Sequence, residues 1–167
     1  QKEDIGPDII AWAKGLGGGF PVGAVMAIAE VGDAMVPGTH GSTFGGNPLA
    51  MRSANAVLEL LLENDFLSNL RKMIVYFDKK MDELIKNDMQ NNPIIFAKKG
   101  SGMLRGFQLN EVVTAGDFSN IAREKSLLLV GAAENTIRLL PPLNTSKEEV
   151  DNAFDILNDI VLQLKKT

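Results

Sequence analysis

The stretch AWAKGLGGGFPVGA, residues 11–24, places one lysine between two short apolar runs that flank a glycine cluster. The run Ile9 to Ala13 and the run Val22 to Ala29 each predict a short buried strand, because they are brief, apolar and bounded by glycine or proline. Gly15 to Pro21 predicts the turn between them. The consecutive glycines 17–19 indicate backbone angles or close approaches that a side chain would forbid.

Lys14 follows a predicted buried strand, and no acidic residue lies within five positions on either side. An ordinary lysine at a strand end packs its stem and keeps its amine in water. A lysine amine removed from water instead becomes partly neutral and nucleophilic, and can form a Schiff base. The residues alone leave both interpretations open, and the solvated lysine is the commoner one.

A second glycine-rich segment, GTHGSTFGGNP, covers residues 38–48. Ser42 and Thr43 offer hydroxyls and amides among glycines, which suits an anion such as a phosphate. A polar surface loop is the simpler interpretation. His40 is the only histidine and carries no assigned role. Asn47 followed by Pro48 predicts a helix start, with Asn47 as the N-cap.

A third segment, NTIRLLPPLN, covers residues 135–144 and contains Arg138 between Ile137 and Leu139. An arginine flanked by core residues needs an anionic partner. That partner is either a structural carboxylate or a substrate carboxylate bound by both arms of the guanidinium.

Beyond residue 64 the composition changes from glycine-rich to charged and amphipathic, which predicts a domain boundary between 1–64 and 65–167. The second domain is predicted to be α+β. Its expected elements are a helix from Asp65 to about residue 90, strands at 94–97, 103–109, 127–130 and 136–139, a helix at 117–125, and a final helix after the capping box of Ser146 and Glu149, ending at Leu164.

The composition excludes several classes of function. The chain has 167 residues, a net charge of −4, no cysteine and one histidine. Disulfide scaffolds, thiolate zinc sites and multi-histidine metal sites are excluded, and an acidic balance argues against a nucleic-acid surface. The longest apolar run is too short to span a membrane. No secretory signal pattern is visible, and Gln1 in place of methionine suggests a fragment or a processed piece.

Taken together and in order, these segments resemble the second half of a class III, fold-type I aminotransferase dependent on pyridoxal phosphate. PDIIAWAKGLGGGFPVGA resembles the family's lysine segment, and GTHGSTFGGNPLA the loop that follows it. GSGMLRGFQL is similar to the small-domain strand pair, and IRLLPPLNTSKEEVD to the arginine segment and last helix. The resemblance implies an α/β chain: the end of the large mixed-sheet cofactor domain followed by a small α+β C-terminal domain.

The resemblance also implies roles for individual residues. Lys14 falls on the lysine that binds pyridoxal 5'-phosphate covalently and moves a proton during catalysis. Thr43 falls on the threonine that reaches the cofactor phosphate of the neighbouring subunit, with Ser42 contributing through its backbone. Arg138 falls on the arginine that binds a substrate carboxylate. No metal is expected.

Within the family the motifs are most similar to the acetylornithine subgroup. The implied reaction moves the terminal amino group of N-acetylornithine, or of a similar omega-amino acid, to 2-oxoglutarate in arginine biosynthesis. Two alternatives stay open: a non-catalytic or structural fragment of such an enzyme, and an aminomutase of the glutamate-1-semialdehyde type.

The resemblance places the active site at the interface of a cytoplasmic homodimer, with no nucleic acid and no membrane involved. It also places the cofactor-stacking aromatic, the aspartate at the pyridine nitrogen and the other phosphate loop in an N-terminal half before residue 1. We therefore expect the chain alone neither to hold the cofactor tightly nor to catalyse.

Overall fold

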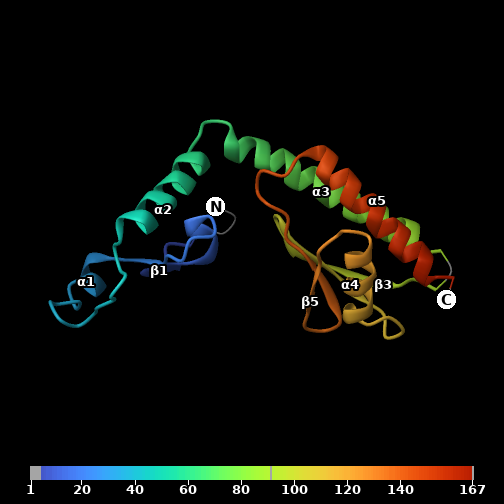
Figure 1. The fold of residues 1–167 in the computed structure, drawn as a ribbon, viewed down its shortest axis with the longest axis horizontal. Helices are drawn as coiled ribbons and strands as arrows, with labels where there is room; N and C mark the ends of the chain where they lie inside the picture. Colours follow the sequence, from blue (N-terminus) through green and yellow to red (C-terminus); the bar gives the residue numbers. More distant parts are fainter. Residues whose placement is uncertain (1–4, 91, 167) are drawn as a thin grey trace. The chain divides into compact units, whose positions relative to one another are not determined.

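The computed structural model describes residues 5–90 and 92–166, which form two compact units, Gln1–Leu67 and Ser68–Thr167 (Figure 1). They are called unit 1 and unit 2 below. The expectation of a fragment rests on Gln1, which lies outside the described residues. The predicted domains, 1–64 and 65–167, stay a prediction.

Unit 1 contains the two expected strands, but they are not buried. Strand β1 (Ile9–Trp12) pairs antiparallel with β2 (Ala24–Ala27), with Ile9 opposite Ala27 and Trp12 opposite Ala24. Ile9 is 55% exposed and Val25 69% exposed, so the prediction of buried strands is wrong for this chain. A two-stranded sheet has little apolar area to share, and no described element of unit 1 covers it.

The turn between the strands is a short 3-10 helix, η1 (Lys14–Gly17), and a four-residue helix, α1 (Ala29–Gly32), follows β2. The first long helix, α2 (Pro48–Leu61), begins where it was predicted. The side-chain oxygen of Asn47 accepts a hydrogen bond from the backbone N–H of Ala50 at 2.9 Å. This bond satisfies one of the free amides of the first turn, and Pro48 has no amide to satisfy.

Helix α2 packs on η1 through small residues. Ala50 and Ala54 are buried, and Val57 lies against the backbone of Gly18. Leu49 and Leu58, whose spacing in the helix indicates the same face, are 63% and 42% exposed. The apolar face of α2 is therefore only partly covered within unit 1.

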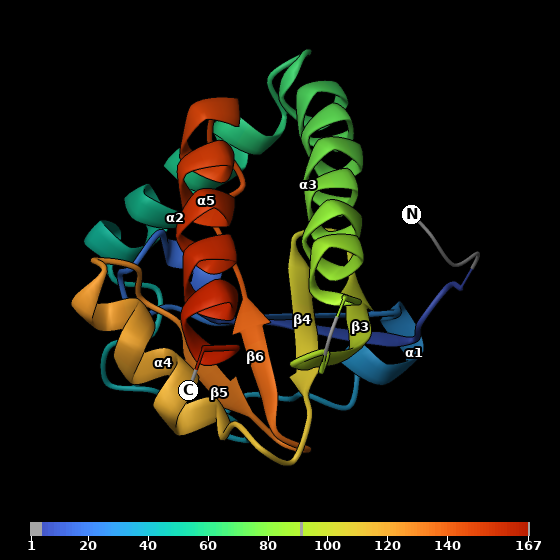
Figure 2. The ribbon, with the colours of Figure 1, turned by 90° about the vertical axis from the view of Figure 1, so that its right-hand side faces the viewer.

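Unit 2 is a sheet covered on one face by helices (Figure 2). Its four strands are antiparallel in the order β3-β4-β6-β5. Their bounds are Ile95–Ser101 for β3, Leu104–Leu109 for β4, Val130–Ala132 for β5 and Thr136–Leu139 for β6. Strands β3 and β4 form a hairpin with Gly102 in its turn at φ 63°, and β3 extends to Ser101, beyond the strand predicted at 94–97.

The helices of unit 2 are α3 (Phe66–Asp88, continuing from unit 1), α4 (Ala115–Glu124) and α5 (Lys147–Leu164). They enclose one apolar core with the sheet. Phe77 of α3 packs edge-on against Phe154 of α5, with ring centroids 5.3 Å apart. Phe107 of β4 packs in the same way against Phe118 of α4 at 5.4 Å. Such pairs add stability beyond the area they bury.

The predicted strand at 127–130 is wrong, because this segment ends helix α4. The backbone N–H of Leu127 bonds to the carbonyl of Ala122 at 2.8 Å, and Ser126 has a left-handed φ of 63°. This is the usual closure of a helix C-terminus. The strand therefore starts only at Val130.

Helix α5 confirms the predicted capping box. The Ser146 hydroxyl accepts from the Glu149 backbone N–H at 3.2 Å, and the Glu149 carboxylate accepts from the Ser146 N–H at 2.7 Å. The helix ends at Leu164, as predicted. Helix α4 starts two residues earlier than predicted, because Thr114 serves as its N-cap by accepting from the Asp117 N–H at 3.0 Å.

Candidate functional site

Lys14 follows β1 after the single residue Ala13 and has an unusual backbone conformation. Its φ is 54°, in the left-handed region that a non-glycine residue rarely occupies. Such a conformation costs about 1–3 kcal/mol and is enriched at active sites and in turns. The strain makes Lys14 the first residue of η1 and turns the chain away from the strand.

The side chain of Lys14 is exposed, and it makes no hydrogen bond or ion pair with any described residue. Of the two interpretations that the sequence left open, the solvated lysine is the one found within this chain. The reason is the same as for the strands, since nothing described in unit 1 covers the end of β1. The structure leaves a free primary amine on a constrained backbone.

The backbone of the glycine cluster after Lys14 shows the close approaches and unusual angles that the sequence predicted. A Cβ on Gly17 would lie 2.7 Å from Cγ1 of Val22, which is closer than carbon atoms approach one another. Gly18 and Gly19 have φ of 58° and 106°. The cluster therefore lets the chain reverse tightly between the two strands.

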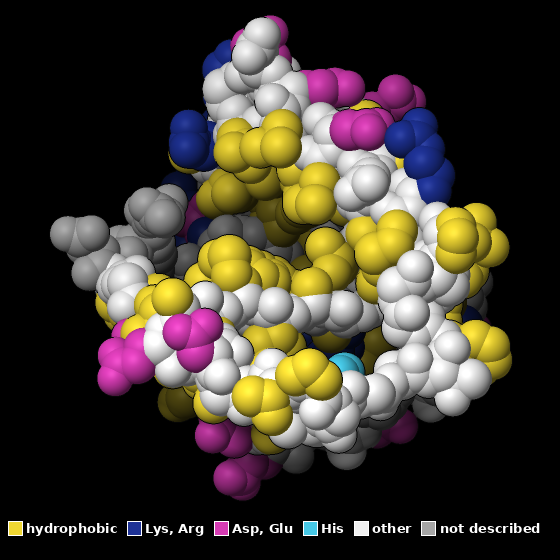
Figure 3. Space-filling view, turned by 90° about the vertical axis from the view of Figure 1, so that its left-hand side faces the viewer, with side chains coloured by type: hydrophobic (Ala, Val, Ile, Leu, Met, Phe, Trp, Pro, Cys, Tyr) yellow, Lys and Arg dark blue, Asp and Glu magenta, His cyan; other side chains and the backbone are white. Residues whose placement is uncertain are grey.

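Unit 1 has a hollow of about 770 Å³. It lies on the face of unit 1 shown in Figure 3, where hydrophobic side chains gather around open space. Among its lining residues are Trp12 of β1, Met51 of α2, and Ser42, Phe44 and His40 of the glycine-rich loop. Aromatic and apolar walls with a few polar groups are typical of small-molecule sites.

Lys14 and Thr43 do not line this hollow, whereas Ser42 does. The Ser42 carbonyl accepts from the Gly45 N–H at 3.1 Å, which makes a tight turn of the loop. The hydroxyls of Ser42 and Thr43 bond to no described residue, and both residues are exposed. The structure therefore does not bring the predicted cofactor residues into one cluster within a single chain.

Arg138 lies in β6 of unit 2. Ile137 and Leu139 on either side are buried, but Arg138 is exposed because strand residues alternate between the two faces of a sheet. Its guanidinium contacts no described acid. Of the two anionic partners that the sequence left open, a structural carboxylate is absent among the described residues, and the guanidinium is free to bind a ligand.

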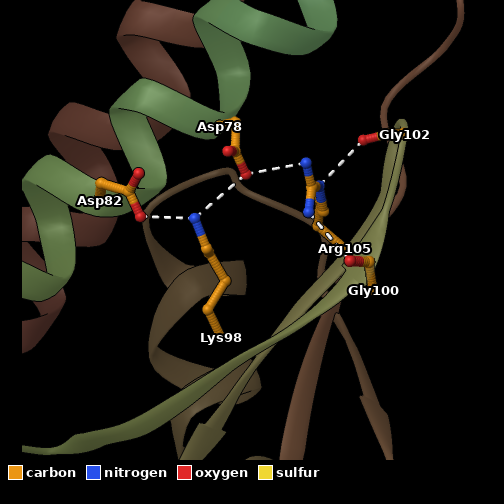
Figure 4. Close-up of polar contacts among 6 residues, drawn as sticks. All are labelled: Asp78, Asp82, Lys98, Gly100, Gly102 and Arg105. Atoms are coloured by element: carbon orange, nitrogen blue, oxygen red, sulfur yellow. Dashed lines mark hydrogen bonds and ion pairs between the residues drawn. The ribbon is translucent and has the colours of Figure 1, made fainter.

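A network of charged side chains joins α3 to the β3–β4 hairpin (Figure 4). The sequence did not reveal this network. The Arg105 guanidinium lies 2.8 Å from the Asp78 carboxylate and donates to the carbonyls of Gly100 and Gly102. Lys98 lies 3.2 Å from Asp78 and 2.5 Å from Asp82. The Asp82 hydrogen bond, followed by the one to Asp78, raises the pKa of Lys98 above its usual value.

This network faces the helices, so its role is structural. The Arg105 side chain is only 12% exposed. The available sequence signal was the spacing of Asp78 and Asp82, four residues apart and so on one face of a helix. Nothing in the sequence indicated which cations meet them.

Comparison with solved structures defines the class of protein. An acetylornithine aminotransferase from Elizabethkingia anophelis superposes with a TM-score of 0.85 and 33% identity, covering 97% of this chain and 40% of that one. An ornithine delta-aminotransferase from Plasmodium falciparum gives a TM-score of 0.87 at 29% identity, covering 98% and 41%. The fold is that of a fold-type I aminotransferase, as predicted.

Sequence comparison identifies the family. Residues 1–161 match the model of the class-III aminotransferases. An acetylornithine aminotransferase from Aquifex aeolicus is 40% identical over 161 residues, 96% of this chain and 39% of that protein. Acetylornithine aminotransferase 1 of Bradyrhizobium diazoefficiens is 39% identical over 92% of this chain and 36% of its own length. The chain belongs to the class-III aminotransferase family.

The chain thus spans about two fifths of the length of these relatives. Class-III aminotransferases are pyridoxal phosphate enzymes, and a structure of a Toxoplasma gondii ornithine aminotransferase, 30% identical, shows pyridoxal phosphate at partial occupancy in its active site. Across the described residues, the helices are too short or too polar to cross a bilayer.

The residues present fit the cofactor in their chemistry. Lys14 supplies an unpaired primary amine, the group that binds an aldehyde covalently. Ser42 and Thr43 supply free hydroxyls and backbone amides in a glycine-rich loop, which suit a phosphate.

Proposed function

We propose that this chain is part of a transaminase that moves the terminal amino group of N-acetylornithine, or of a similar omega-amino acid, to 2-oxoglutarate. The observation that carries the proposal is Lys14, an unpaired amine on a left-handed backbone, placed between strand and glycine turn. The 37–42% identity to acetylornithine aminotransferases supports the choice of donor and a place in arginine biosynthesis.

The proposed roles follow from the chemistry of each residue. Lys14 would hold pyridoxal 5'-phosphate covalently, and its amine, once released, would take a proton from the substrate carbon next to nitrogen and deliver it to the carbon on the other side of that nitrogen. Ser42 and Thr43 bind the phosphate. Arg138 binds a substrate carboxylate through its planar fork. The cofactor, when bound, supplies an electron sink.

We also propose that the working enzyme is a cytoplasmic homodimer with the active site at the subunit interface. The chain supplies residues 1–64 to the cofactor domain and 65–167 to a small C-terminal domain, and a further N-terminal half completes the site. Exposed apolar side chains of unit 1 support this, because Val25, Phe44 and Leu62 are each more than two thirds exposed, at 69%, 80% and 78%.

Substitution of Lys14 in the complete protein tests this function. We expect Lys14→Ala to lower 2-oxoglutarate-dependent turnover of N-acetylornithine by at least about a hundredfold and to abolish the absorbance band of the bound cofactor. Lys79→Ala, an exposed lysine on α3, is the matched control and should leave both unchanged. Full turnover in Lys14→Ala would refute the proposed role.

The same assay separates the alternatives. An aminomutase needs no external amino acceptor, so turnover that is independent of 2-oxoglutarate would favour it. Absence of any turnover by the complete protein would favour a structural role. Comparison of N-acetylornithine with ornithine decides the donor, and equal conversion of both would contradict the choice of N-acetylornithine.

A further inference from the structure

The sheet of unit 2 has one face under helices and one face that no described helix of the unit covers. Phe107 and Ile137 belong to the core under the helices. Their neighbours Gly106 and Arg138 therefore lie on the other, open face. Lys98 reaches the carboxylates of α3, so Lys99, the next residue along β3, is also on the open face.

Three residues form a row across this open face. In the strand register, Lys99 is opposite Gly106, and Gly106 is opposite Arg138. Directly opposed residues point to the same face, and adjacent strands lie about 4.8 Å apart, so the Cα atoms of Lys99 and Arg138 are about 10 Å apart. Gly106 puts no side chain between them. Gly106 itself is buried, and the two long cationic side chains lie on either side of it.

We propose that Lys99 is a specificity-determining residue that binds a substrate carboxylate together with Arg138, above Gly106. The proposal rests on the proposed function, in which Arg138 binds a substrate carboxylate. The guanidinium provides a planar fork and the ammonium a mobile point charge, so one carboxylate can contact both. The ligands of this site are keto acids and amino acids with a free carboxylate, and not their neutral esters.

Gly106 is suited to its place in the row by more than its small size. A Cβ on Gly106 would lie 2.9 Å from the carbonyl oxygen of Ile137 and 2.9 Å from Cγ2 of Thr136. Any side chain here would push against the neighbouring strand and occupy the space between the two cations. The glycine therefore permits the close strand packing and places no side chain between Lys99 and Arg138.

Lys99 already has an internal carboxylate partner. Its ammonium pairs with Glu134, and the two side chains are 38% and 70% exposed. The hydrogen bond from Lys99 is the main reason that the pKa of Glu134 is lowered. Exposed pairs of this kind are weak, so another carboxylate can exchange with Glu134.

The turn that carries Glu134 is held firmly. Glu134 and Asn135 have left-handed φ of 56° and 48°. The Asn135 amide donates to the carbonyls of Asn110 and Val113, each at 2.8 Å, and its oxygen accepts from the Ala115 N–H at 2.7 Å. Glu134 is therefore a fixed competitor for Lys99. Removal of Lys99 should weaken carboxylate binding, and removal of the Glu134 charge should strengthen it.

A titration of the purified 167-residue chain tests the opposite effects on carboxylate binding that are expected for Lys99 and Glu134. The probe is 2-oxoglutarate, its neutral dimethyl ester is the control ligand, and the readout is the NMR shift of the Gly106 backbone amide. We expect saturable binding of the acid only. Lys99→Met should raise Kd about fivefold, Glu134→Gln should lower it about two- to threefold, and Arg138→Gln should raise it at least as much as Lys99→Met.

The matched controls are Lys79→Met and Glu83→Gln, which break an exposed pair on α3. They should leave Kd unchanged. The proposal is overturned if the parent chain shows no saturable shift, if Lys99→Met binds like Lys79→Met, or if Glu134→Gln weakens binding. A merely structural Lys99–Glu134 pair would give equal losses of stability and no opposite effects on Kd.

The complete protein separates this proposal from the proposed function. If Lys99→Met raises KM for 2-oxoglutarate with little change in kcat, the proposed role of Lys99 is supported. Normal transamination with an unchanged KM would contradict the role of Lys99 but not the proposed function. Specific binding by the chain without transamination in the complete protein would contradict the proposed function but not the role of Lys99.

Discussion

Lys165, the residue after α5, is paired with Asp88 in the last turn of α3. The ammonium lies 2.9 Å from Oδ1 of Asp88, which is only 1% exposed. The same ammonium donates to the carbonyls of Asp88 and, at 2.7 Å, Gln90. Oδ2 of Asp88 accepts from the Ile95 N–H at 2.6 Å. One buried carboxylate therefore joins the ends of α3 and α5 to the start of β3.

Removal of Lys165 should destabilise unit 2, because it leaves the charge of Asp88 buried without its cation. We expect Lys165→Met to lower the free energy of unfolding by about 3 kcal/mol, measured by urea denaturation of the purified chain. Lys166→Met, its exposed neighbour, should change the free energy by less than about 0.5 kcal/mol. Equal effects of the two substitutions would contradict this role of Lys165.

The Asp151 carboxylate predicts a pH dependence of stability. Tyr76 donates a hydrogen bond to it, and Lys80 and Lys147 lie 3.0 and 3.2 Å away. The Tyr76 hydrogen bond, followed by Lys80, holds the pKa of Asp151 well below its usual range. The folded chain then binds fewer protons than the unfolded chain below about pH 4, so its stability falls as the pH is lowered further.

Asp151→Asn removes this contribution, and the free energy of unfolding should therefore fall less steeply between about pH 4 and pH 2 than in the parent chain. Tyr76→Phe, which removes the largest cause of the shift, should give an intermediate slope. Urea denaturation at a series of pH values measures both. Identical slopes in the parent chain and Asp151→Asn would show that this carboxylate does not govern the loss of stability at acid pH.

The capping box of α5 should be a local source of stability. Ser146→Ala removes the acceptor for the Glu149 N–H and should cost about 1 kcal/mol, which lowers Tm by roughly 4–8 °C for a unit of this size. Ser146→Asp, which keeps an N-cap acceptor, should restore most of the loss. Thermal unfolding followed by circular dichroism measures both variants. A stable Ser146→Ala variant would mean that water replaces the cap at no cost.

Helix ends were predictable because their causes lie within a few residues. The cap at Asn47 and the box of Ser146 and Glu149 need only local contacts, and the structure contains both. Burial was not predictable in the same way. An apolar run such as Val22 to Ala29 indicates a strand, but it does not indicate what covers the strand, and Met26 is 56% exposed.

The same difference between local and long-range causes applies to the candidate site. The order of the motifs singled out Lys14 and Arg138 and led to the family that the comparisons confirm. The left-handed backbone of Lys14 and the alignment of Lys99 with Arg138 depend on chain reversal and strand register. The contact of Asp78 with Arg105 joins residues far apart in sequence. No local pattern encodes such relationships.

Two glycines of unit 2 should respond in opposite directions to the same substitution. Gly106→Ala places a Cβ 2.9 Å from backbone and side-chain atoms of β6, whereas in α4 the nearest atom to a Cβ on Gly116 is 3.6 Å away. We expect Gly106→Ala to cost about 1–3 kcal/mol through overpacking. Gly116→Ala should add about 0.5 kcal/mol, because alanine loses less backbone entropy in a helix. Urea denaturation of both variants gives the two values. A Gly106→Ala chain as stable as the parent would mean that β4 and β6 separate freely. That result would contradict the strand packing on which the row of Lys99, Gly106 and Arg138 depends.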